Sequence, residues 1–360
     1  MTRIFVISKS FTPNYQHILD AIHNRKPQRL PLYEHIISHE IMEQALGIKF
    51  AEMGQGNDVD LNEYFKHYCR FFREMTYDTI SFEICITPFL PDHGAIMGGR
   101  PGPIQNRQDF EKFPWDEIPG IFWESADKQL KYLLQNIPSG MQVIGGIGNG
   151  VFEISEDLMG FEYLCVTQME DPDLFTDLFK RIGELVLNIW EKFLKVYAEH
   201  FVVCRFGDDL GYKGSTLLSP QVIRTHILPE YKNVINLIHN YHKPFLLHSC
   251  GNIFEVMDDL IAIGIDGKHS NEDIIAPFDT WVERYGQRIA LFGGIDVDVL
   301  CQKKPGEVFD QVIDSGRRFR HKMDGYALGS GNSIPDFVPL EGYLAMIKAV
   351  QALREEEKMM

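Results

Sequence analysis

The stretch Phe245-Leu246-Leu247-His248-Ser249-Cys250-Gly251-Asn252 is an apolar, strand-like run that ends in polar side chains and a glycine turn. Residues two apart in an extended strand point to the same side, so the imidazole of His248 and the sulfur of Cys250 can converge on one ion. Zn²⁺ prefers such donors, and a catalytic zinc needs three protein ligands and an open position. The same spacing also fits a hydrogen-bonded histidine beside a small buried thiol, so the pair alone does not decide between a metal site and a structural pair.

Apolar runs of this kind recur along the chain and alternate with longer segments of helical spacing. Apolar residues at steps of three or four over Pro172–Tyr197 predict a helix, and Ser219-Pro220 predicts the start of another. Connections of this length are too long for hairpins and favour a parallel sheet. The eight predicted strands are 30–35, 79–84, 142–146, 202–206, 245–249, 266–269, 289–293 and 325–330.

Repeated strand and helix units predict the fold class. Eight of them are the number that closes a barrel, so we expect an α/β fold, a (β/α)8 TIM barrel that forms a single domain over residues 1–360 with an N-terminal helical extension. An open doubly wound sheet is the alternative. The run Gly145-Gly146-Ile147-Gly148-Asn149-Gly150 is rich in glycine but lacks the G-x-G-x-x-G spacing, which argues against a dinucleotide site.

The composition is that of a folded, acidic protein. Hydrophobic residues make up 44% and charged residues 24% of the 360 residues, and the formal net charge is −16. Such a surface repels phosphate backbones and anionic headgroups, so binding of nucleic acid or of a membrane surface is not expected. The six cysteines are scattered, no leader-like segment opens the chain and no apolar run approaches about 20 residues, which predicts a cytoplasmic protein with reduced thiols.

Polar or ionisable side chains follow almost every predicted strand. In a parallel barrel, catalytic groups gather at the carboxyl ends of the strands. We therefore expect Glu83, Asp208 and Asp209 to be catalytic, and His248 and Cys250 to bind a metal. The side chains expected to bind a small-molecule substrate are Glu34, Asn149, Tyr212 and Asn332.

Some of these residues also fit structural roles. Asp208-Asp209 before Leu210-Gly211 suits a loop turn and a cap as well as catalysis. Glu83 lies in an apolar run, where a dry and unpaired carboxylate is costly, and this favours a functional role. The long irregular stretch 88–115 is typical of a lid or a partner surface, or of an ordered structural excursion.

A series of short motifs, taken in order, is similar to one known family. They are Ile18-Leu19-Asp20-Ala21-Ile22, Tyr77-Asp78-Thr79, Gly160-Phe161-Glu162-Tyr163-Leu164, Asp171-Pro172, Asp208-Asp209, His248-Ser249-Cys250-Gly251-Asn252, Gly293-Gly294-Ile295-Asp296 and Gly329-Ser330-Gly331-Asn332-Ser333-Ile334-Pro335. The chain thereby resembles the uroporphyrinogen decarboxylase superfamily, whose fold is the (β/α)8 barrel. The superfamily includes the decarboxylase of haem synthesis and corrinoid-linked methyltransferases that use zinc to activate a thiol.

The resemblance to the methyltransferase branch implies a zinc held by a His-x-Cys pair and by a cysteine in the last loop. His248 and Cys250 match the pair, but the last-loop position falls on Asn332. Asparagine is a poor zinc ligand. The site therefore binds zinc weakly, takes a third ligand from Glu83 or Asp208, or binds none.

The resemblance to the decarboxylase branch implies an arginine-rich motif after the first strand, an aspartate after the second and a histidine in the last loop. Here residues 33–37 contain no arginine, Glu83 stands near the place of the aspartate and Ser330 near that of the histidine. A substrate with many carboxylates also needs a cationic cradle, for which Lys213 and Arg100 are the available cations near the predicted loops.

Methyl transfer therefore ranks above decarboxylation. We predict a methyltransferase that moves a methyl group between a corrinoid protein and a thiol or other small acceptor, assisted by zinc, with the corrinoid supplied by a partner protein. A homodimer is a further expectation. Three alternatives stay open: a uroporphyrinogen decarboxylase-type carboxy-lyase, metal-free acid–base chemistry by Glu83 and the Asp208-Asp209 pair, and a non-catalytic barrel within a methyl-transfer complex.

Overall fold

The computed structural model describes residues 11–98 and 100–359, and contacts within it define two compact units. The first unit contains the described residues up to 82, 129–144 and those from 266 onward. The second unit contains the described residues of 83–128 and 145–265. The expected single domain over 1–360 stays a prediction. Within the described ranges, no helix is long and apolar enough to cross a membrane.

Seven strands belong to one sheet, and their order in the sheet is their order along the chain. The registers defined within each unit are all parallel. This confirms the α/β class with a parallel sheet, as in TIM-barrel-like folds. The strands are β1 (Thr79–Cys85), β2 (Gln142–Gly148), β3 (Phe201–Gly207), β4 (Phe245–His248), β5 (Gly267–His269), β6 (Ala290–Ile295) and β7 (Tyr326–Ser330).

Strand register within each unit aligns the ends that precede polar residues. In the second unit, Gly207 of β3 lies opposite His248 of β4. The N–H of Asp208 then donates to the carbonyl of His248 over 3.0 Å. In the first unit, Ile295 of β6 lies opposite Ser330 of β7. The residues that follow the two strands of each pair therefore begin at the same edge of the sheet.

The predicted first strand is reduced to a single bridge at Leu32, which pairs with β7, so an eighth strand is not confirmed. The N–H of Leu30 donates to a carboxylate oxygen of Glu357 over 2.8 Å, and its carbonyl accepts from Arg354 over 2.7 Å. Pro31 has no N–H to donate. The backbone groups that would extend the ladder are thus hydrogen-bonded to helix side chains at Leu30, and Pro31 lacks the N–H that a ladder needs.

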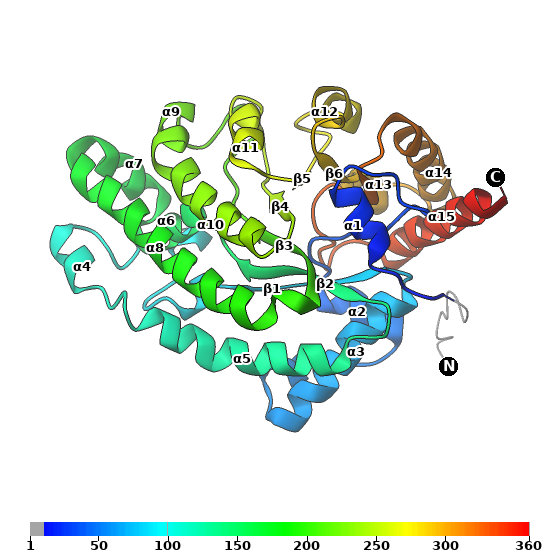
Figure 1. Ribbon diagram of the computed structural model, residues 1–360, viewed down its shortest axis with the longest axis horizontal. Helices are drawn as coiled ribbons and strands as arrows, with labels where there is room; N and C mark the ends of the chain where they lie inside the picture. The colour runs from blue at the N-terminus through cyan, green and yellow to red at the C-terminus, as the bar shows by residue number, and fades with distance from the viewer. Residues whose placement is uncertain (1–10, 99, 360) are drawn as a thin grey trace. The chain divides into compact units, whose positions relative to one another are not determined.

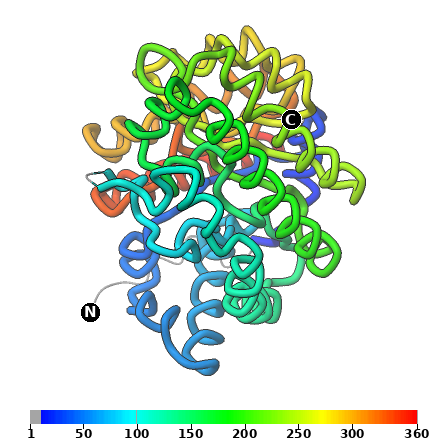
Figure 2. The backbone as a smooth tube through the Cα atoms, turned by 90° about the vertical axis from the view of Figure 1, so that its left-hand side faces the viewer, coloured from blue at the N-terminus to red at the C-terminus, as the bar shows by residue number. Residues whose placement is uncertain are grey.

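Helices precede, connect and follow the strands. Three of them, α1 to α3, come before β1, where an N-terminal helical extension was expected. That these helices extend a barrel stays a prediction. In Figure 2, the helices α6 to α11 of the second unit run from green to yellow. The α-helices are α1 (Gln16–Ile22), α2 (His39–Leu46), α3 (Asp58–Glu74), α4 (Arg107–Lys112), α5 (Ile118–Asn136), α6 (Val151–Met159), α7 (Phe161–Glu170), α8 (Pro172–Tyr197), α9 (Pro220–Val222), α10 (Leu228–Asn240), α11 (Met257–Ile263), α12 (Phe278–Tyr285), α13 (Val297–Gln302), α14 (Pro305–Lys322) and α15 (Leu340–Met359).

Two predicted helix starts are confirmed, and capping explains both. Asp171 accepts from the N–H of Leu174 over 2.9 Å, and Pro172 occupies the first turn of α8. Ser219 accepts from the N–H of Val222 over 3.3 Å at the start of α9, which a π-helical turn joins to α10. The apolar face of α8 is buried, and α8 packs against α10 in the core of the second unit (Figure 1).

The stretch 88–115 contains short helical elements. They are η2 (Thr87–Phe89), η3 (Ala95–Met97) and α4. The buried carboxylate of Asp157, on α6, accepts from the N–H of Gly94 over 2.8 Å and from that of Ile96 over 3.2 Å. These bonds attach η3 to α6 within the second unit. A role of the stretch as a lid or a partner surface stays a prediction.

Gly251→Ala should destabilise the protein by about 2–4 kcal/mol. Gly251 has a φ of +79°, and an added Cβ would lie 2.1 Å from the carbonyl carbon of Gly211. The matched variant Gly214→Ala, where an added Cβ has nothing within 4 Å, should change stability by less than about 1 kcal/mol. Urea unfolding measures both effects. Equal losses in the two variants would contradict the close approach of the two backbone segments.

Candidate functional site

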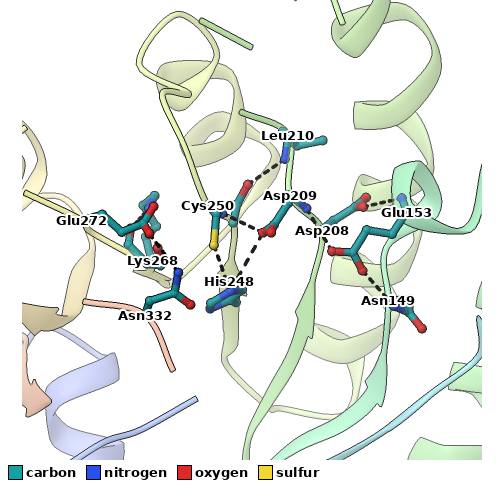
Figure 3. A network of polar contacts seen from close by, with 12 residues as sticks. Asn149, Glu153, Asp208, Asp209, Leu210, His248, Cys250, Lys268, Glu272 and Asn332 are labelled. Atoms are coloured by element: carbon teal, nitrogen blue, oxygen red, sulfur yellow. Dashed lines mark hydrogen bonds and ion pairs between the residues drawn. The ribbon is translucent and has the colours of Figure 1, made fainter. Parts of the chain in front are cut away.

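Three side chains of the second unit converge just after β3 and β4. Sγ of Cys250 lies 3.5 Å from Nε2 of His248, and Oδ1 of Asp209 lies 3.9 Å from the same nitrogen (Figure 3). One donor atom from each of the three residues lies within 4.8 Å of the other two. His248 and Cys250 thus converge as their spacing predicts, and Asp209 completes what we call the Asp209–His248–Cys250 cluster.

Hydrogen bonds fix the loops that carry this cluster. The N–H of Cys250 donates to Oδ1 of Asp209 over 2.8 Å. The N–H of Leu210 donates to Oγ of the buried Ser249 over 3.2 Å. The side chain of His248 is 7% exposed, whereas that of Asp209 is 44% exposed. The imidazole is therefore buried, and the carboxylate side of the cluster is open to solvent.

Asp208 uses its carboxylate to hold the start of helix α6. It accepts from the N–H of Phe152 over 2.9 Å, from the N–H of Glu153 over 2.7 Å and from the hydroxyl of Tyr231 over 2.5 Å. Burial raises the pKa of Asp208 to about 7, and these three donors oppose the rise. The contacts match the capping alternative that the sequence left open, while a catalytic role stays a prediction.

Glu153, a half-buried residue that sequence reasoning missed, links Asn149 to Asp209. Its Oε2 accepts from Nδ2 of Asn149 over 2.8 Å, and its Oε1 accepts from the N–H of Asp209 over 3.3 Å (Figure 3). Burial and then the charges of Asp208 and Asp209 raise the pKa of Glu153 well above its usual range. The sequence signal for Glu153 was its position in the first turn of a helix that directly follows a strand. Substrate binding by Asn149 stays a prediction.

Glu83 forms a buried ion pair with Arg205. Nε and Nη2 of Arg205 each lie 2.9 Å from Oε2 of Glu83, and the two side chains are 0% and 8% exposed. The carboxylate therefore has a compensating charge, which removes the desolvation argument for a catalytic Glu83. Arg205 was missed among the cations, although an arginine inside an apolar strand was a visible signal. A catalytic Glu83 stays a prediction.

Tyr212 lies on the loop after β3 with an exposed ring. Its side chain is 63% exposed. Its backbone N–H donates to the carbonyl of Ser215 over 2.8 Å, and its carbonyl accepts from the N–H of Asn252 over 2.7 Å. The loop is thus fixed while the ring faces solvent, and contact of the ring with substrate is still an expectation.

In the first unit, Glu34 and Asn332 meet through Ser330. The N–H of Ser330 donates to Oε1 of Glu34 over 2.8 Å, and its hydroxyl contacts Oε2 of Glu34 and the carbonyl of Asn332. Nδ2 of Asn332 donates to Oε1 of Glu272 over 3.0 Å (Figure 3). Burial raises the pKa of Glu34 to about 8, although both bonds from Ser330 oppose the rise. Substrate contact by Glu34 and Asn332 stays a prediction.

Strand β5 carries a buried cation that sequence reasoning also missed. Lys268 is 1% exposed, donates through Nζ to the carbonyl of Ser270 and lies 4.2 Å from the ring centroid of Trp281. The neighbouring His269 places Nε2 3.0 Å from the carbonyl of Ser330. A lysine inside the strand predicted over 266–269 was the signal for this residue.

Comparison with known families now identifies the chain's relatives. The sequence profile of the family described as uroporphyrinogen decarboxylase (URO-D) matches residues 101–353. The chain belongs to the URO-D family. No curated protein matches this URO-D family chain.

A solved structure shares the fold of this URO-D family member. A methyltransferase from Methanosarcina mazei superposes with a TM-score of 0.69 and 16% identity, covering 94% of this chain and 97% of that one. Xylanase B from Clostridium stercorarium F9 gives 0.40 and 10%, covering 62% and 83%. A glycoside hydrolase family 5 enzyme from Prevotella bryantii B14 gives 0.43 and 9%, covering 95% and 99%. The last two scores are too low to support an inference, and the first establishes the fold.

The donor set of the Asp209–His248–Cys250 cluster in this URO-D family chain fits a divalent metal. It offers one imidazole nitrogen, one sulfur and one carboxylate oxygen, and zinc takes each of these. The sequence left Glu83 or Asp208 as the third ligand. Their carboxylates are engaged by Arg205 and by the start of α6, so Asp209 is the carboxylate at the cluster.

Proposed function

We propose that this protein is a methyltransferase that moves a methyl group between a corrinoid protein and a thiol or another small acceptor. The observation that supports this most is the convergence of donor atoms from Asp209, His248 and Cys250 within 4.8 Å of one another. Three protein ligands and an open position are typical of catalytic zinc. The structural neighbour from Methanosarcina mazei, a methyltransferase, suggests the same hypothesis.

The chemistry of the proposal is transfer of a methyl group to sulfur. Zinc, when bound, would lower the pKa of a substrate thiol so that the thiolate predominates. The acceptor sulfur forms a bond to the methyl carbon, the bond between methyl and the corrinoid's cobalt breaks with its electron pair left on the cobalt, and the thiol proton passes to solvent. The open side of the cluster at the half-exposed Asp209 gives an acceptor access.

Residues around the cluster are proposed to position it. Glu153 accepts from the N–H of Asp209, and Asp208 fixes the helix that carries Glu153. In this proposal Asp208 and Glu153 act through Asp209, and for Asp208 this positioning role stands in place of the predicted catalytic one. The corrinoid partner is a proposal that rests on the sequence resemblance, and a homodimer is a further proposal. The proposed substrate contacts are those of Glu34, Asn149, Tyr212 and Asn332.

A methyl-transfer assay tests the proposed function. Purified full-length protein with added zinc, methylcobalamin as donor and a small thiol as acceptor should produce thiol-dependent loss of the methylcobalamin absorbance. Asp209→Asn keeps the shape of the side chain but weakens it as a ligand, so the rate should fall by about 10- to 100-fold. Asp314→Asn, on the exposed face of α14, is the matched control and should keep the wild-type rate.

Several outcomes would contradict the methyltransferase proposal. Wild-type protein with a full complement of zinc that methylates no thiol, amine or folate acceptor would overturn it. If such an inactive protein also forms a stable complex with a corrinoid protein, the non-catalytic alternative is favoured. Turnover that does not depend on metal and is unchanged in Asp209→Asn would favour acid–base chemistry elsewhere.

Uroporphyrinogen decarboxylation is the second candidate, because the matching family bears that description. A substrate with many carboxylates requires cations that are not already compensated. Arg205, the buried cation of the second unit described above, pairs with Glu83 over 2.9 Å. Chromatography of uroporphyrinogen incubated with the protein should therefore show no product with fewer carboxylates. Steady formation of such a product would reverse the order of the two candidates.

A further inference from the structure

We propose that the second unit carries a further binding site, which takes a small zwitterion with an apolar body, the class to which apolar α-amino acids belong. The site is a cavity of about 700 Å³. The residues that line it come from η3, the segment that follows η3, α6 and α7, all within the second unit. No residue of the Asp209–His248–Cys250 cluster lines this cavity, so the proposal goes beyond the proposed methyl transfer.

Backbone hydrogen bonds hold the walls of this cavity together. The N–H of Gly102 donates to the carbonyl of Met159 over 3.1 Å. The N–H of Ile104 donates to the carbonyl of Leu158 over 2.9 Å. On the other side, Asp157 holds η3 against the same helix through the two bonds described above. The walls therefore have a set separation, as is typical of a preformed site for a small molecule.

Glu156 brings a carboxylate to the cavity. It lies one turn after Glu153 on α6, and its half-buried side chain lines the cavity. Among the described residues, no donor or cation pairs with this carboxylate, and burial and then the charges of Asp208 and Asp209 raise its pKa to about 8. The exposed Glu162 adds a second carboxylate to the lining. A cationic group of a ligand would compensate the charge at Glu156.

Arg100 brings a guanidinium group to the same cavity. Its side chain is exposed, and its Nη2 donates to the backbone carbonyl of Asp92 over 3.5 Å. No carboxylate in the described part of the chain pairs with it. Arginine binds carboxylates through directed and often bidentate hydrogen bonds. The guanidinium group therefore suits the carboxylate of a ligand.

Gly94 lies between the two charges. An added Cβ at Gly94 would lie 2.5 Å from Nη2 of Arg100, so the guanidinium group packs against this backbone. The N–H of Gly94 donates to Asp157, which is the neighbour of Glu156 on α6. The guanidinium group thus packs against the residue that is bonded to the turn of α6 carrying Glu156. One small molecule can therefore contact both charges.

Apolar side chains line much of the rest of the cavity and partly face solvent. Ile96 and Phe161 are each 37% exposed, and Val166 is 44% exposed. A ligand that covers them gains from the burial of apolar surface. Opposite charges beside an apolar wall match a molecule with an ammonium group, a carboxylate and an apolar body. A ligand with only one of the two charges would leave the other side chain of the cavity uncompensated.

Calorimetric titration of the full-length protein with L-norleucine tests the proposal. We expect saturable binding with one site per chain. Hexanoate lacks the ammonium group and pentylamine lacks the carboxylate, so each should bind at least about tenfold more weakly. Arg100→Gln and Glu156→Gln should each weaken binding of L-norleucine by about tenfold or more. The matched controls Arg224→Gln and Glu184→Gln alter side chains that pair elsewhere in the second unit, and their affinities should stay within about twofold of wild type.

Proton release gives a second readout, which reports on Glu156. Because the pKa of Glu156 is raised to about 8, this carboxyl is mostly protonated at pH 7. An ammonium group beside it favours the ionised form, so binding should release up to one proton per chain. Titrations in two buffers with different ionisation enthalpies measure this release. It should disappear in Glu156→Gln, in which Asp208 and Asp209 are still present.

Four results would overturn the proposal. They are the absence of saturable heat with L-norleucine, binding of hexanoate or pentylamine as tight as that of L-norleucine, binding without proton release in the wild type, and unchanged affinity in both Arg100→Gln and Glu156→Gln. The substituted side chains are exposed or half-buried, so both variants should fold, as circular dichroism would check. The titration contains no methyl donor, so its failure would leave the proposed methyl transfer to its own assay.

Discussion

His248→Ala should reduce the zinc content of the purified protein from near one atom per chain to near zero, and slow thiol methylation by more than about 100-fold. His248 supplies the nitrogen that lies 3.5 Å from Sγ of Cys250 and 3.9 Å from Asp209. Its removal leaves two of the three donors of the cluster. Loss of a residue that only supports a metal ligand already costs about 10- to 100-fold, so loss of a ligand should cost more.

Elemental analysis and initial rates measure the effect of this substitution. His321→Ala, at the exposed end of α14, is the matched control and should keep both zinc and rate. Cys250→Ser should behave like His248→Ala, whereas Cys165→Ser, on α7, should behave like wild type. Wild-type zinc content in His248→Ala would place the metal elsewhere in the protein.

Glu34→Gln should remove a large part of the loss of stability that we expect as pH rises from about 5 to about 8. Burial raises the pKa of Glu34 from 4.5 to about 8. Between these values, the folded protein keeps a proton that the unfolded chain has released, so stability falls as pH rises. The slope is at most about 1.4 kcal/mol per pH unit, which limits the contribution of Glu34 to about 5 kcal/mol across the window.

A glutamine at position 34 fits the same hydrogen bonds as the protonated acid. Its oxygen can accept from the N–H of Ser330, and its amide can donate to the hydroxyl of Ser330, which can then donate to the carbonyl of Asn332. Urea unfolding at pH 5 to 9 should give similar stabilities at pH 5 and a variant more stable than wild type at pH 9. The control Glu63→Gln, at a half-exposed residue paired with Lys66, should run parallel to wild type. A Glu34→Gln curve parallel to wild type would refute the raised pKa.

Features that depend on neighbours in the sequence could be predicted from it. The caps at Asp171 and Ser219 involve residues within three positions, so the starts of α8 and α9 were visible in the sequence. The segment around Leu30 was different. Its backbone groups bind Arg354 and Glu357, which lie 324 and 327 positions away, so its apolar pattern predicted a strand that the fold replaces with one bridge.

In the candidate site, too, the features set by local geometry could be predicted and those set by distant partners could not. The strand period predicted that His248 and Cys250 converge, because only local backbone geometry is involved. The choice between Asp208 and Asp209 could not be predicted, since it depends on where the start of α6 and Tyr231 lie. The partner of Glu83 could not be predicted either, because Arg205 is 122 positions away in the sequence. Distant partners decide whether a buried carboxylate is compensated or available for chemistry.

X-ray absorption at the zinc edge, recorded on the purified wild-type protein and on Cys250→Ser, tests the proposed metal site most directly. The account predicts bound zinc with a sulfur neighbour in the wild type, and loss of that sulfur signal in Cys250→Ser, because Sγ of Cys250 is the sulfur in the cluster with Asp209 and His248. Absence of zinc from the wild type, or an unchanged sulfur signal in Cys250→Ser, would contradict the account.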